Sequence, residues 1–564
     1  MKNKCLVAAQ LAVLALLTII AFYPSLKNEF TNWDDPELVL ANTRIRSLSA
    51  AGVRDLFTTS YAGFGGYTPL VFLSYAVDYH FSGLDPRAFH AVNLFLHVLN
   101  VLLVYAVLFL LCRRTSLSLA GAALFSLHPL HAEAVAWTQG RKDVLFSFFY
   151  LAALAAYLLF LRKKRKRVFY AAALLLFVLS LFSKVTAISF PLVLLLLEYQ
   201  ASRKIDRSSL ARALPFVIMS AAVLVLAFIT NKSGPPPAPM EAVPYLKNLG
   251  LFFYAFVFYI AKAFLPLGLL GRYSVDIGRY PWQVALALAV FAAAIALFVL
   301  AYKRKPEAVT FGIAFFVLTL APTLPFHFSG QPYADRYMYL PLLGILFIPI
   351  LMFALPPGET REEKPRPRWT WQVPVLVIAV LLGAQTRGLC AVWHDSLTLW
   401  AHVIRKDPGN ATAFLKRGEA LDAAGRTDEA LADFAEAARL SPRDPSIFNN
   451  RGVIYFRRTE YEKAMADFDR AVALNPFYVM GYINRGILRG RVGQFEQAVK
   501  DFSLALILDK TSYLARYYRG LAFKELKKYD AAIDDLETAF RLKPSDQVRA
   551  EIEALKKMKS ARSR

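Results

Sequence analysis

The sequence is poor in cysteine and in charged residues. It has only 3 cysteines in 564 residues. Because Cys5, Cys112 and Cys390 all lie in or beside apolar runs, neither a disulfide framework nor a Cys-x-x-Cys metal site is available. Only 19% of the residues are charged and 56% are hydrophobic, which is too apolar for an ordinary soluble protein. The composition therefore indicates a protein with several membrane-spanning segments.

Acidic residues are scarce relative to basic ones, and the formal net charge is +24. A nucleic-acid-binding protein would concentrate this excess on a soluble face. Residues 401–564, the most highly charged part, hold 30 basic and 23 acidic residues and so carry only +7. The remaining +17 lies in the apolar first 400 residues, largely in short loops. We expect no nucleic-acid partner.

Twelve apolar segments long enough to cross a membrane follow one another before residue 392. They lie at 5–22, 90–112, 117–137, 143–161, 168–183, 185–199, 211–230, 247–265, 283–302, 307–326, 337–355 and 371–390. The first is interpreted as a span rather than a signal peptide, because no small-residue cleavage site precedes Tyr23. We predict an all-α polytopic domain over residues 1–392, with eleven or twelve crossings and a large outer loop at 27–89.

Short basic loops favour the cytoplasmic side of a membrane. Such loops lie at 113–114, 162–167, 203–207, 303–305 and 361–368. All of them face the cytoplasm if the N-terminus does and if segment 247–265 enters the membrane without crossing it. The loops at 27–89, 138–142, 231–282 and 327–336, and everything after residue 390, then lie outside.

The C-terminal region, 401–564, repeats small residues and prolines at a constant interval. The period is visible in Gly418, Gly452, Gly486 and Gly520, in Ala430, Ala464, Ala498 and Ala532, and in Pro408, Pro442, Pro476 and Pro544, with Lys510 in the place of one proline. A period of about 34 residues is typical of tetratricopeptide repeats, in which small residues let two antiparallel helices approach closely. We predict a linker at 393–410, four repeats over 411–544, and a capping helix with a basic tail at 545–564.

Such a solenoid presents a concave surface to an extended peptide or a helix. Two interpretations stay open for Arg451, Arg485, Arg519 and the repeat tyrosines. They line this surface, or they belong to the packing between helices.

An acidic pair, Asp34 and Asp35, follows the first apolar segment on the predicted outer side. Adjacent carboxylates can supply a general base, because one raises the pKa of the other or positions it. Two other interpretations compete. Asp35 before Pro36 can begin a turn or a helix, or both charges can belong to a solvated loop.

A second polar cluster contains His128, His131 and Glu133. Two histidines three residues apart can share one face of a helix, which raises the question of a metal site. Zinc sites on helices usually use a spacing of four and a remote third ligand, so we favour hydrogen-bonding roles and predict no metal.

Cations recur at the predicted outer boundary of the membrane. Arg141 and Lys142 follow the histidine cluster, Lys184 separates two short apolar segments, and Asp335 with Arg336 precedes another. Guanidinium and ammonium groups here suit an anionic, lipid-linked phosphate. The competing interpretation for Arg141 and Lys142 is that they reach ordinary lipid headgroups.

Taken together, these motifs resemble the TMTC family, the transmembrane and tetratricopeptide-repeat-containing proteins. The resemblance rests on residues 30–35, 67–70, 89–97, 127–143 and 335–341, in this order, followed by the repeats. It covers essentially the whole chain.

The resemblance implies a glycosyltransferase of the polytopic GT-C class, similar to protein O-mannosyltransferases. Such enzymes take a sugar, here mannose, from a polyprenyl or dolichyl phosphate and place it on Ser or Thr hydroxyls outside the cytosol. A catalytic aspartate of their first outer loop maps onto Asp34 or Asp35, and this Asp-Asp pair departs from the Asp-Glu of the protein mannosyltransferases. The choice of base stays open.

In this interpretation Arg141, Lys184, Arg336 and Lys142 bind the donor phosphate, and His128, His131, Glu133 and Asp335 are further site candidates. No cofactor is required, because fixed cations can replace a divalent metal. The repeats would hold the acceptor polypeptide. A short repeat array and compact loops suggest a bacterial or archaeal plasma membrane. The alternatives are a non-enzymatic membrane scaffold, for which so many spans are excessive, and a transporter, whose charges would lie near mid-membrane.

Overall fold

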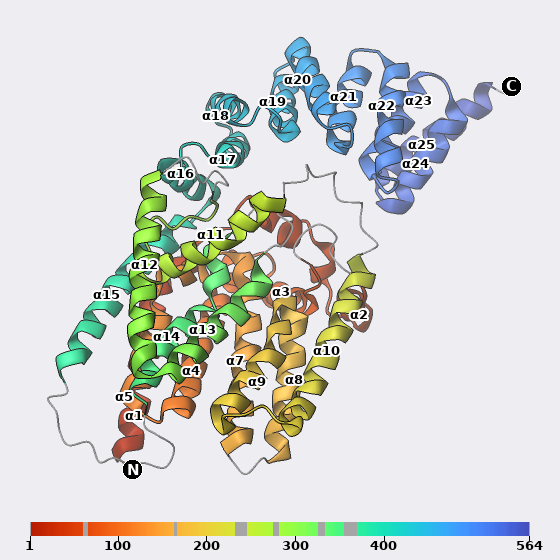
Figure 1. Ribbon diagram of the computed structural model, residues 1–564. Coiled ribbons are helices and arrows are strands. Elements are labelled where there is room, and N and C mark those ends of the chain that lie inside the picture. The colour runs from red at the N-terminus through yellow and green to blue at the C-terminus, as the bar shows by residue number, and fades with distance from the viewer. Residues whose placement is uncertain are drawn as a thin grey trace. The chain divides into compact units, whose positions relative to one another are not determined.

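The computed structural model describes residues 2–59, 66–162, 166–231, 245–273, 281–324, 333–354 and 369–562. This part of the chain is built from helices and contains no strand (Figure 1), which confirms the predicted all-α class. It divides into two compact units, Met1–Pro408 and Gly409–Arg564.

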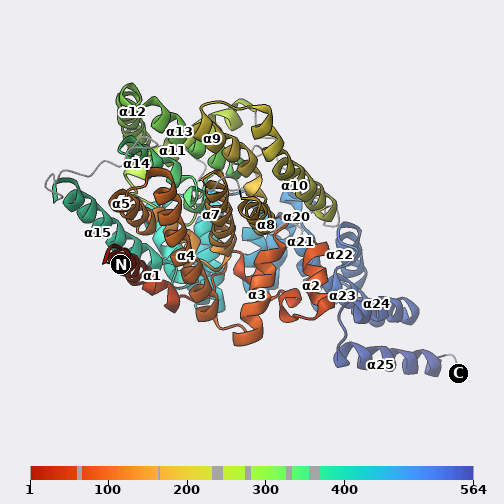
Figure 2. The same ribbon diagram turned by 90° about the horizontal axis from the view of Figure 1, so that it is seen from below.

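Each predicted apolar segment contains a helix of the first unit. These helices are α1 (Lys2–Phe22), α4 (Pro86–Cys112), α5 (Thr115–Ser126), α7 (Arg141–Arg162), α8 (Arg167–Ser183), α9 (Phe190–Ser202), α10 (Arg207–Asn231), α11 (Tyr245–Phe264), α12 (Pro281–Arg304), α13 (Pro306–Leu320), α14 (Leu342–Met352) and α15 (Trp369–Val392). Seen from below, α4, α7 and α8 lie side by side in the middle of the bundle (Figure 2).

Eight helical stretches of the described chain are long and apolar enough to cross a membrane, and three apolar helices are shorter. The shorter ones are Thr115–Ser126, Arg167–Ser183 and Tyr254–Phe264. The number of crossings therefore stays a prediction. The basic loop at 361–368, most of the loop at 327–336, and parts of those at 162–167 and 231–282 lie outside the described residues.

One expected span, 117–137, is interrupted. Because a proline disfavours helical backbone in the residue before it, His128 is extended and α5 ends at Ser126. The chain continues through η4 (Pro129–His131), α6 (Ala132–Ala136) and η5 (Thr138–Gly140) before α7 begins. Gly140 is required at this turn, since a Cβ atom there would overlap the carbonyl group of Ala134. The whole segment is buried, so it carries polar side chains into the first unit.

Helices α13 and α14 cross through two glycines. A Cβ atom on Gly344 would lie 2.5 Å from the Phe316 nitrogen and 2.7 Å from the Gly312 carbonyl oxygen. Small residues of this kind let helix backbones approach closely in membrane proteins. Shortly before α14 begins, η9 (Asp335–Met338) ends, so this crossing supports the segment that carries Arg336.

The expected outer loop at 27–89 is largely helical in its described part. It contains η2 (Pro36–Leu40), η3 (Thr43–Arg46), α2 (Ala50–Thr58) and α3 (Pro69–Ser82), and η1 (Tyr23–Lys27) leads into it. Helix α3 buries Phe72, Tyr75 and Asp78 and packs against α8 and η3. The acidic pair lies in the short stretch between η1 and η2.

The second unit contains the predicted tetratricopeptide array. Its helices are α17 (Ala411–Ala423), α18 (Thr427–Leu440), α19 (Pro445–Arg457), α20 (Tyr461–Leu474), α21 (Val479–Arg491), α22 (Phe495–Leu508), α23 (Tyr513–Glu525), α24 (Tyr529–Leu542) and α25 (Asp546–Arg562). Equivalent helices, such as α17 and α19, begin one repeat period apart. In the first repeat a Cβ atom on Gly418 would lie 2.7 Å from the Phe434 ring, which explains the periodic glycine.

Each repeat also holds an ion pair between its two helices. Arg417 pairs with Asp433, Arg451 with Asp467, Arg485 with Asp501, and Arg519 with Asp535, each through two nitrogens. Two parallel hydrogen bonds fix the geometry of such a pair. The periodic arginines therefore serve helix packing, which is one of the two interpretations left open by the sequence.

Between the two expected domains the structure has a helix where a linker was expected. Helix α16 (Ser396–Lys406) buries Leu399, Trp400 and Val403, and the first unit extends to Pro408. Apolar residues at helical spacing give α16 a face to bury, so the segment packs as part of the first unit.

Candidate active site

The two carboxyl groups of the acidic pair occupy different environments. Asp35 is fully buried, and its Oδ2 accepts hydrogen bonds from the Thr31 amide (2.8 Å) and hydroxyl (3.1 Å). Asp34 is partly exposed, and its side chain has no hydrogen-bond or ion-pair partner within the described ranges. Asp35 therefore closes the loop on which Asp34 stands, and Asp34 is the accessible carboxylate.

Burial raises the pKa of Asp35 to about 7, although the two hydrogen bonds from Thr31 act in the opposite direction. The Trp137 indole acts in the same direction, as a donor to this carboxyl group, at a geometry longer or more bent than an ordinary hydrogen bond. A pair of neighbouring carboxyl groups with such different surroundings can divide two roles between them.

The acidic loop, residues 28–35, packs against tryptophan rings. Trp33 stacks on Trp137 with ring centres 5.0 Å apart and lies parallel to Trp393 at 6.0 Å. Trp400 contacts Trp33 at 5.4 Å, so four of the 7 tryptophans of the chain gather here. The Asn28 amide adds hydrogen bonds to the Ala136 and Cys390 carbonyl oxygens. Trp393 and Trp400 were missed by the sequence analysis, and an excess of tryptophan beside α15 was the available signal.

Arg141 is not placed where a ligand could reach it. It is fully buried, and its guanidinium donates hydrogen bonds to Asn93, Ser74, Asp78 and the Phe89 carbonyl oxygen at 2.5–3.0 Å. These partners come from α3 and α4, whereas Arg141 begins α7. Arg141 therefore joins α7 to α3 and α4. This geometry does not support direct phosphate binding.

Lys142, the next residue, is differently placed. It is partly exposed, its Nζ lies 5.8 Å from the centre of the Trp137 ring, and within the described residues no carboxylate forms an ion pair with it. The Asp143 carboxylate and, more weakly, that of Asp34 attract it, whereas Arg336 and Lys184 repel it. Lys142 is therefore a cation beside the acidic pair that a ligand can use.

Arg336 and Lys184 complete the cationic side. The Arg336 guanidinium lies 5.2 Å from the centre of the Trp137 ring and pairs with Glu133, which also accepts the Arg336 amide at 2.9 Å. Lys184 pairs with Asp143 at 2.5 Å and lies 5.5 Å from the centre of the Tyr337 ring. The structure thus brings Lys142 and Arg336 to the Trp137 ring, on which Trp33, the neighbour of Asp34 in the chain, is stacked. Lys184 lies beside Tyr337.

Several buried polar atoms at this place lack a partner. Within the described ranges they are Thr138 Oγ1, Gln139 Nε2, Asp143 Oδ2 and Arg336 Nε. A buried polar atom without a hydrogen bond lowers the stability of the folded protein by roughly 1–3 kcal/mol. Clusters of such atoms are therefore uncommon in folded proteins. A polar ligand would supply partners to them.

The side chains of the histidine cluster are engaged in hydrogen bonds and ring contacts. His128 binds the Ala263 carbonyl oxygen through Nε2 at 3.1 Å, and the Leu130 amide through Nδ1. His131 packs against Phe125 and Tyr339, with ring centres 4.4 Å and 4.6 Å away. Among the residues that the structure describes, no three His, Cys, Asp or Glu side chains are arranged to hold a metal ion. Glu133 serves Arg336 instead.

The segment that carries Arg336 is anchored on both sides. Asp335 accepts a hydrogen bond from the Tyr273 hydroxyl at 2.6 Å. The Tyr339 hydroxyl binds His97 Nδ1 at 2.6 Å and accepts one from the Asn100 amide at 3.0 Å. Asp335 is therefore a structural partner here, and His97 helps to fix Arg336 through the backbone.

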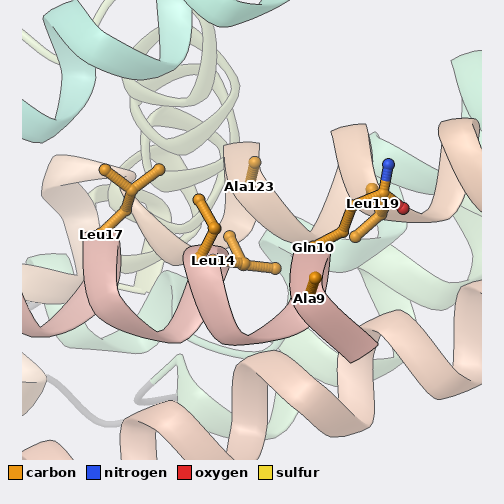
Figure 3. Close-up of a pocket in the computed structure, with 7 residues that line it drawn as sticks. Ala9, Gln10, Leu14, Leu17, Leu119 and Ala123 are labelled. Atoms are coloured by element: carbon orange, nitrogen blue, oxygen red, sulfur yellow. The ribbon is translucent and has the colours of Figure 1, made fainter. Parts of the chain in front are cut away.

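An apolar groove of about 320 Å³ lies apart from these polar groups, between α1 and α5. It is lined by Ala9, Gln10, Val13, Leu14, Leu17, Leu119 and Ala123, and Figure 3 shows Gln10 as its polar side chain. A groove of this composition suits a hydrocarbon chain better than a polar ligand.

Known proteins resemble both units. A family model of the tetratricopeptide repeat matches residues 393–445, 415–479 and 483–546. Human protein O-mannosyl-transferase TMTC1 is 33% identical over 160 residues, which are 27% of this chain and 18% of that protein. Mouse TMTC4 is 24% identical over 74% of this chain and 65% of its own length. The Caenorhabditis elegans protein O-mannosyl-transferase F38B6.6 is 22% identical over 76% of this chain and 62% of its own length.

The matched regions span less than two thirds of the length of each of these relatives. Two of the matches nevertheless cover about three quarters of this chain, and eight helical stretches of its described part are long and apolar enough to cross a membrane. The protein is therefore an integral membrane protein, and the comparisons confirm its resemblance to the TMTC family of protein O-mannosyl-transferases.

Proposed function

We propose that the protein is a membrane glycosyltransferase that moves mannose from a polyprenyl or dolichyl phosphate to a Ser or Thr hydroxyl of a protein. The observation that carries this proposal is that the cations Lys142 and Arg336 lie at the Trp137 ring, on which Trp33 stacks, directly before the accessible carboxylate Asp34 in the chain. The names of the relatives, protein O-mannosyl-transferases, support it.

The reaction needs one base and a cationic site for the leaving group. Asp34 takes the proton of the acceptor hydroxyl, and the hydroxyl oxygen bonds to the anomeric carbon of the sugar. The bond from that carbon to the phosphate oxygen breaks, and the phosphate keeps the electron pair. Lys142 and Arg336 neutralise the charge of the departing phosphate. A single displacement of this kind inverts the anomeric carbon, as in inverting glycosidases.

The remaining polar residues hold these groups in place. Asp35 closes the loop that carries Asp34, Glu133 orients Arg336, and Arg141 fixes the start of α7 and so the position of Lys142. Lys184 acts through Asp143 and Tyr337 at the edge of the site. Fixed cations supply the charge that a divalent metal would otherwise bring, so the proposed mechanism uses no metal or cofactor.

We place the acceptor on the repeats and the site on the outer side of the membrane. Stacked tetratricopeptide helices suit an extended polypeptide, and tethering the acceptor near the site raises its effective concentration. The N-terminus is cytoplasmic in this proposal, and the membrane is a bacterial or archaeal plasma membrane. The apolar grooves between helices would take the prenyl chain.

The test is a transfer assay with purified protein, polyprenyl-phosphate-mannose and a Ser/Thr-rich peptide. We expect Asp34→Asn to lower kcat by roughly 100-fold or more, the range for loss of a general base. Asp35→Asn keeps an oxygen that can accept the hydrogen bonds from Thr31, so its kcat should fall less than that of Asp34→Asn. Glu29→Gln is the matched control, because it removes an exposed carboxylate from the same loop. Unchanged transfer by Asp34→Asn, or no transfer by the wild type, would contradict the proposal.

A further inference from the structure

The acidic loop is bound by the segment that follows the last apolar helix. The Trp400 indole donates a hydrogen bond to Asn32 Oδ1 at 2.7 Å, and the Asn32 amide donates one to Ser396 Oγ at 2.8 Å. The Glu29 amide donates a third, at 2.7 Å, to the His394 carbonyl oxygen. Asn32 stands close to Asp34 in the same loop, so this segment determines where the proposed base stands.

The same segment continues the repeat period backward. Ser396, Trp400, Val403 and Pro408 stand one period before Ala430, Phe434, Ala437 and Pro442. Helix α16 ends at Lys406, again one period before Leu440, where α18 ends. The equivalent of α17 would be 377–389, which lies inside α15.

In its sequence register helix α16 corresponds to the second helix of a repeat, and we call it the incomplete repeat. The end of α15 does not pack as its first helix, because α15 and α16 contact each other far less than the two helices of each complete repeat do. The match to the repeat family model begins at residue 393, one period before α18 begins at Thr427, in agreement with this register. The repeat period thus starts within the first unit, at the helix that holds the acidic loop.

This incomplete repeat departs from the others at two positions. Alanine occupies the first position in all four repeats, where Ser396 stands here, and phenylalanine or leucine occupies the second, where Trp400 stands. Packing of two repeat helices requires a small residue and an apolar one at these places, and it needs neither the serine hydroxyl nor the indole N–H. These two polar groups are the ones that bind Asn32.

We propose that Ser396 and Trp400 are positioning residues for the transfer reaction, which bind Asn32 and so hold Asp34 in place from a helix of the repeat period. This inference rests on the proposed function for its catalytic consequence. The two hydrogen bonds to Asn32 are present in the structure whatever the reaction is.

The test converts the incomplete repeat to the sequence of its neighbours with Ser396→Ala and Trp400→Phe together. Both new side chains occur at the equivalent positions 430 and 434, so α16 should keep its fold while Asn32 loses these two hydrogen bonds. Misplacement of a reacting group by about 1 Å costs about 100-fold in rate. We expect kcat to fall by roughly 10- to 100-fold, with little change in the KM for the donor because the cations are not touched.

Two controls accompany this variant. Phe468→Leu makes a change of the same kind in the second repeat, using the residue found at 536, and should leave kcat unchanged. Ser396→Thr keeps the hydroxyl group and should retain more activity than Ser396→Ala. An unaltered kcat in the double variant would overturn the proposal.

Hydrogen exchange provides a readout that does not depend on activity. The Asn32 amide should exchange faster in the double variant, while α17 to α24 exchange as in the wild type. If exchange of residues 28–35 stays unchanged, Ser396 and Trp400 do not hold the loop and the inference is wrong. If the wild type transfers no sugar but the loop exchange responds, the proposed function fails and the tie between α16 and the loop stands.

Discussion

At the scale of the residue, neighbours in sequence take opposite roles because their surroundings differ. Asp34 is accessible, whereas Asp35 is buried and bonded to Thr31. Lys142 has no ion-pair partner in the described part of the chain, whereas Arg141 is saturated by partners from two other helices. Access to a ligand, rather than residue type, separates the groups that can react from those that hold the fold.

The raised pKa of Asp35 predicts a pH-dependent effect on stability. Its pKa of about 7 in the folded protein lies above the ordinary value of 3.8, so the folded state keeps a proton that the unfolded chain loses. The stability contribution of Asp35 therefore falls as the pH rises from about 4 to about 7. Asparagine cannot ionise, so Asp35→Asn should raise the melting temperature in detergent at pH 8 more than at pH 5. An equal shift at both values would contradict this burial effect.

Substitutions of Arg141 and Lys142 should have different effects, the first on stability and the second on activity. Arg141→Lys keeps the charge but cannot reach all four partners, and each buried acceptor that it leaves without a hydrogen bond costs about 1–3 kcal/mol. We expect a clearly lower melting temperature. Lys142→Gln should leave the melting temperature unchanged and lower kcat/KM for the lipid-linked donor. The opposite pattern would show that Arg141 is the phosphate contact.

Residue roles were only partly predictable from the sequence. The acidic pair and the cations could be found because ionisable residues are costly in an apolar chain. The burial of Arg141 could not, since its partners Asn93 and Asp78 are 48 and 63 residues away in sequence and only the packing of α3 and α4 on α7 brings them together.

At the scale of the element, close helix crossings and helix interruptions shape the site. The glycine crossing of α13 and α14 lies next to the segment with Arg336, and the break at Pro129 brings Glu133 and Trp137 into the first unit. Hydropathy alone predicts a continuous span over 117–137, because the polar residues there are few. The proline rule could have ended that helix earlier, whereas the buried path of 128–140 depends on tertiary contacts.

The glycine crossing makes a prediction about stability. Gly344→Ala places a Cβ atom 2.5 Å from the Phe316 nitrogen, so α13 and α14 must move apart, at a cost of about 1–3 kcal/mol. The control is Gly388→Ala in α15, where nothing lies within 4 Å of the new atom and alanine favours the helix. Thermal unfolding in detergent should show a loss for the first variant only. Equal melting temperatures would argue against close packing at Gly344.

At the scale of the whole molecule, charge is distributed for orientation. Most of the +24 net charge lies in short loops between apolar helices, and the proposed reactive groups are a few residues on the other side. The repeat array was predictable because glycine, alanine and proline recur in the sequence at the repeat period. Its start inside the first unit was not evident, since Ser396 and Trp400 replace the alanine and phenylalanine that mark the other repeats.

The proposed topology can be tested by cysteine labelling. A cysteine at Lys510, exposed in the repeats, should react with an impermeant maleimide in intact cells. A cysteine at Lys166, exposed between α7 and α8, should react only after the cells are permeabilised. Cys5 is exposed, so both variants carry Cys5→Ser, and the Cys5→Ser protein, in which Cys112 and Cys390 are buried, provides the background. Reversal of the two patterns would place the repeats in the cytoplasm.

The most direct test of the central claim is the anomeric configuration of the product. The purified protein is supplied with polyprenyl-phosphate-mannose of known configuration and a Ser/Thr-rich peptide, and the glycopeptide is examined by NMR. With Asp34 as the base of a single displacement, the peptide should carry mannose of the opposite configuration to the donor. Retained configuration, or a peptide without mannose, would contradict the account.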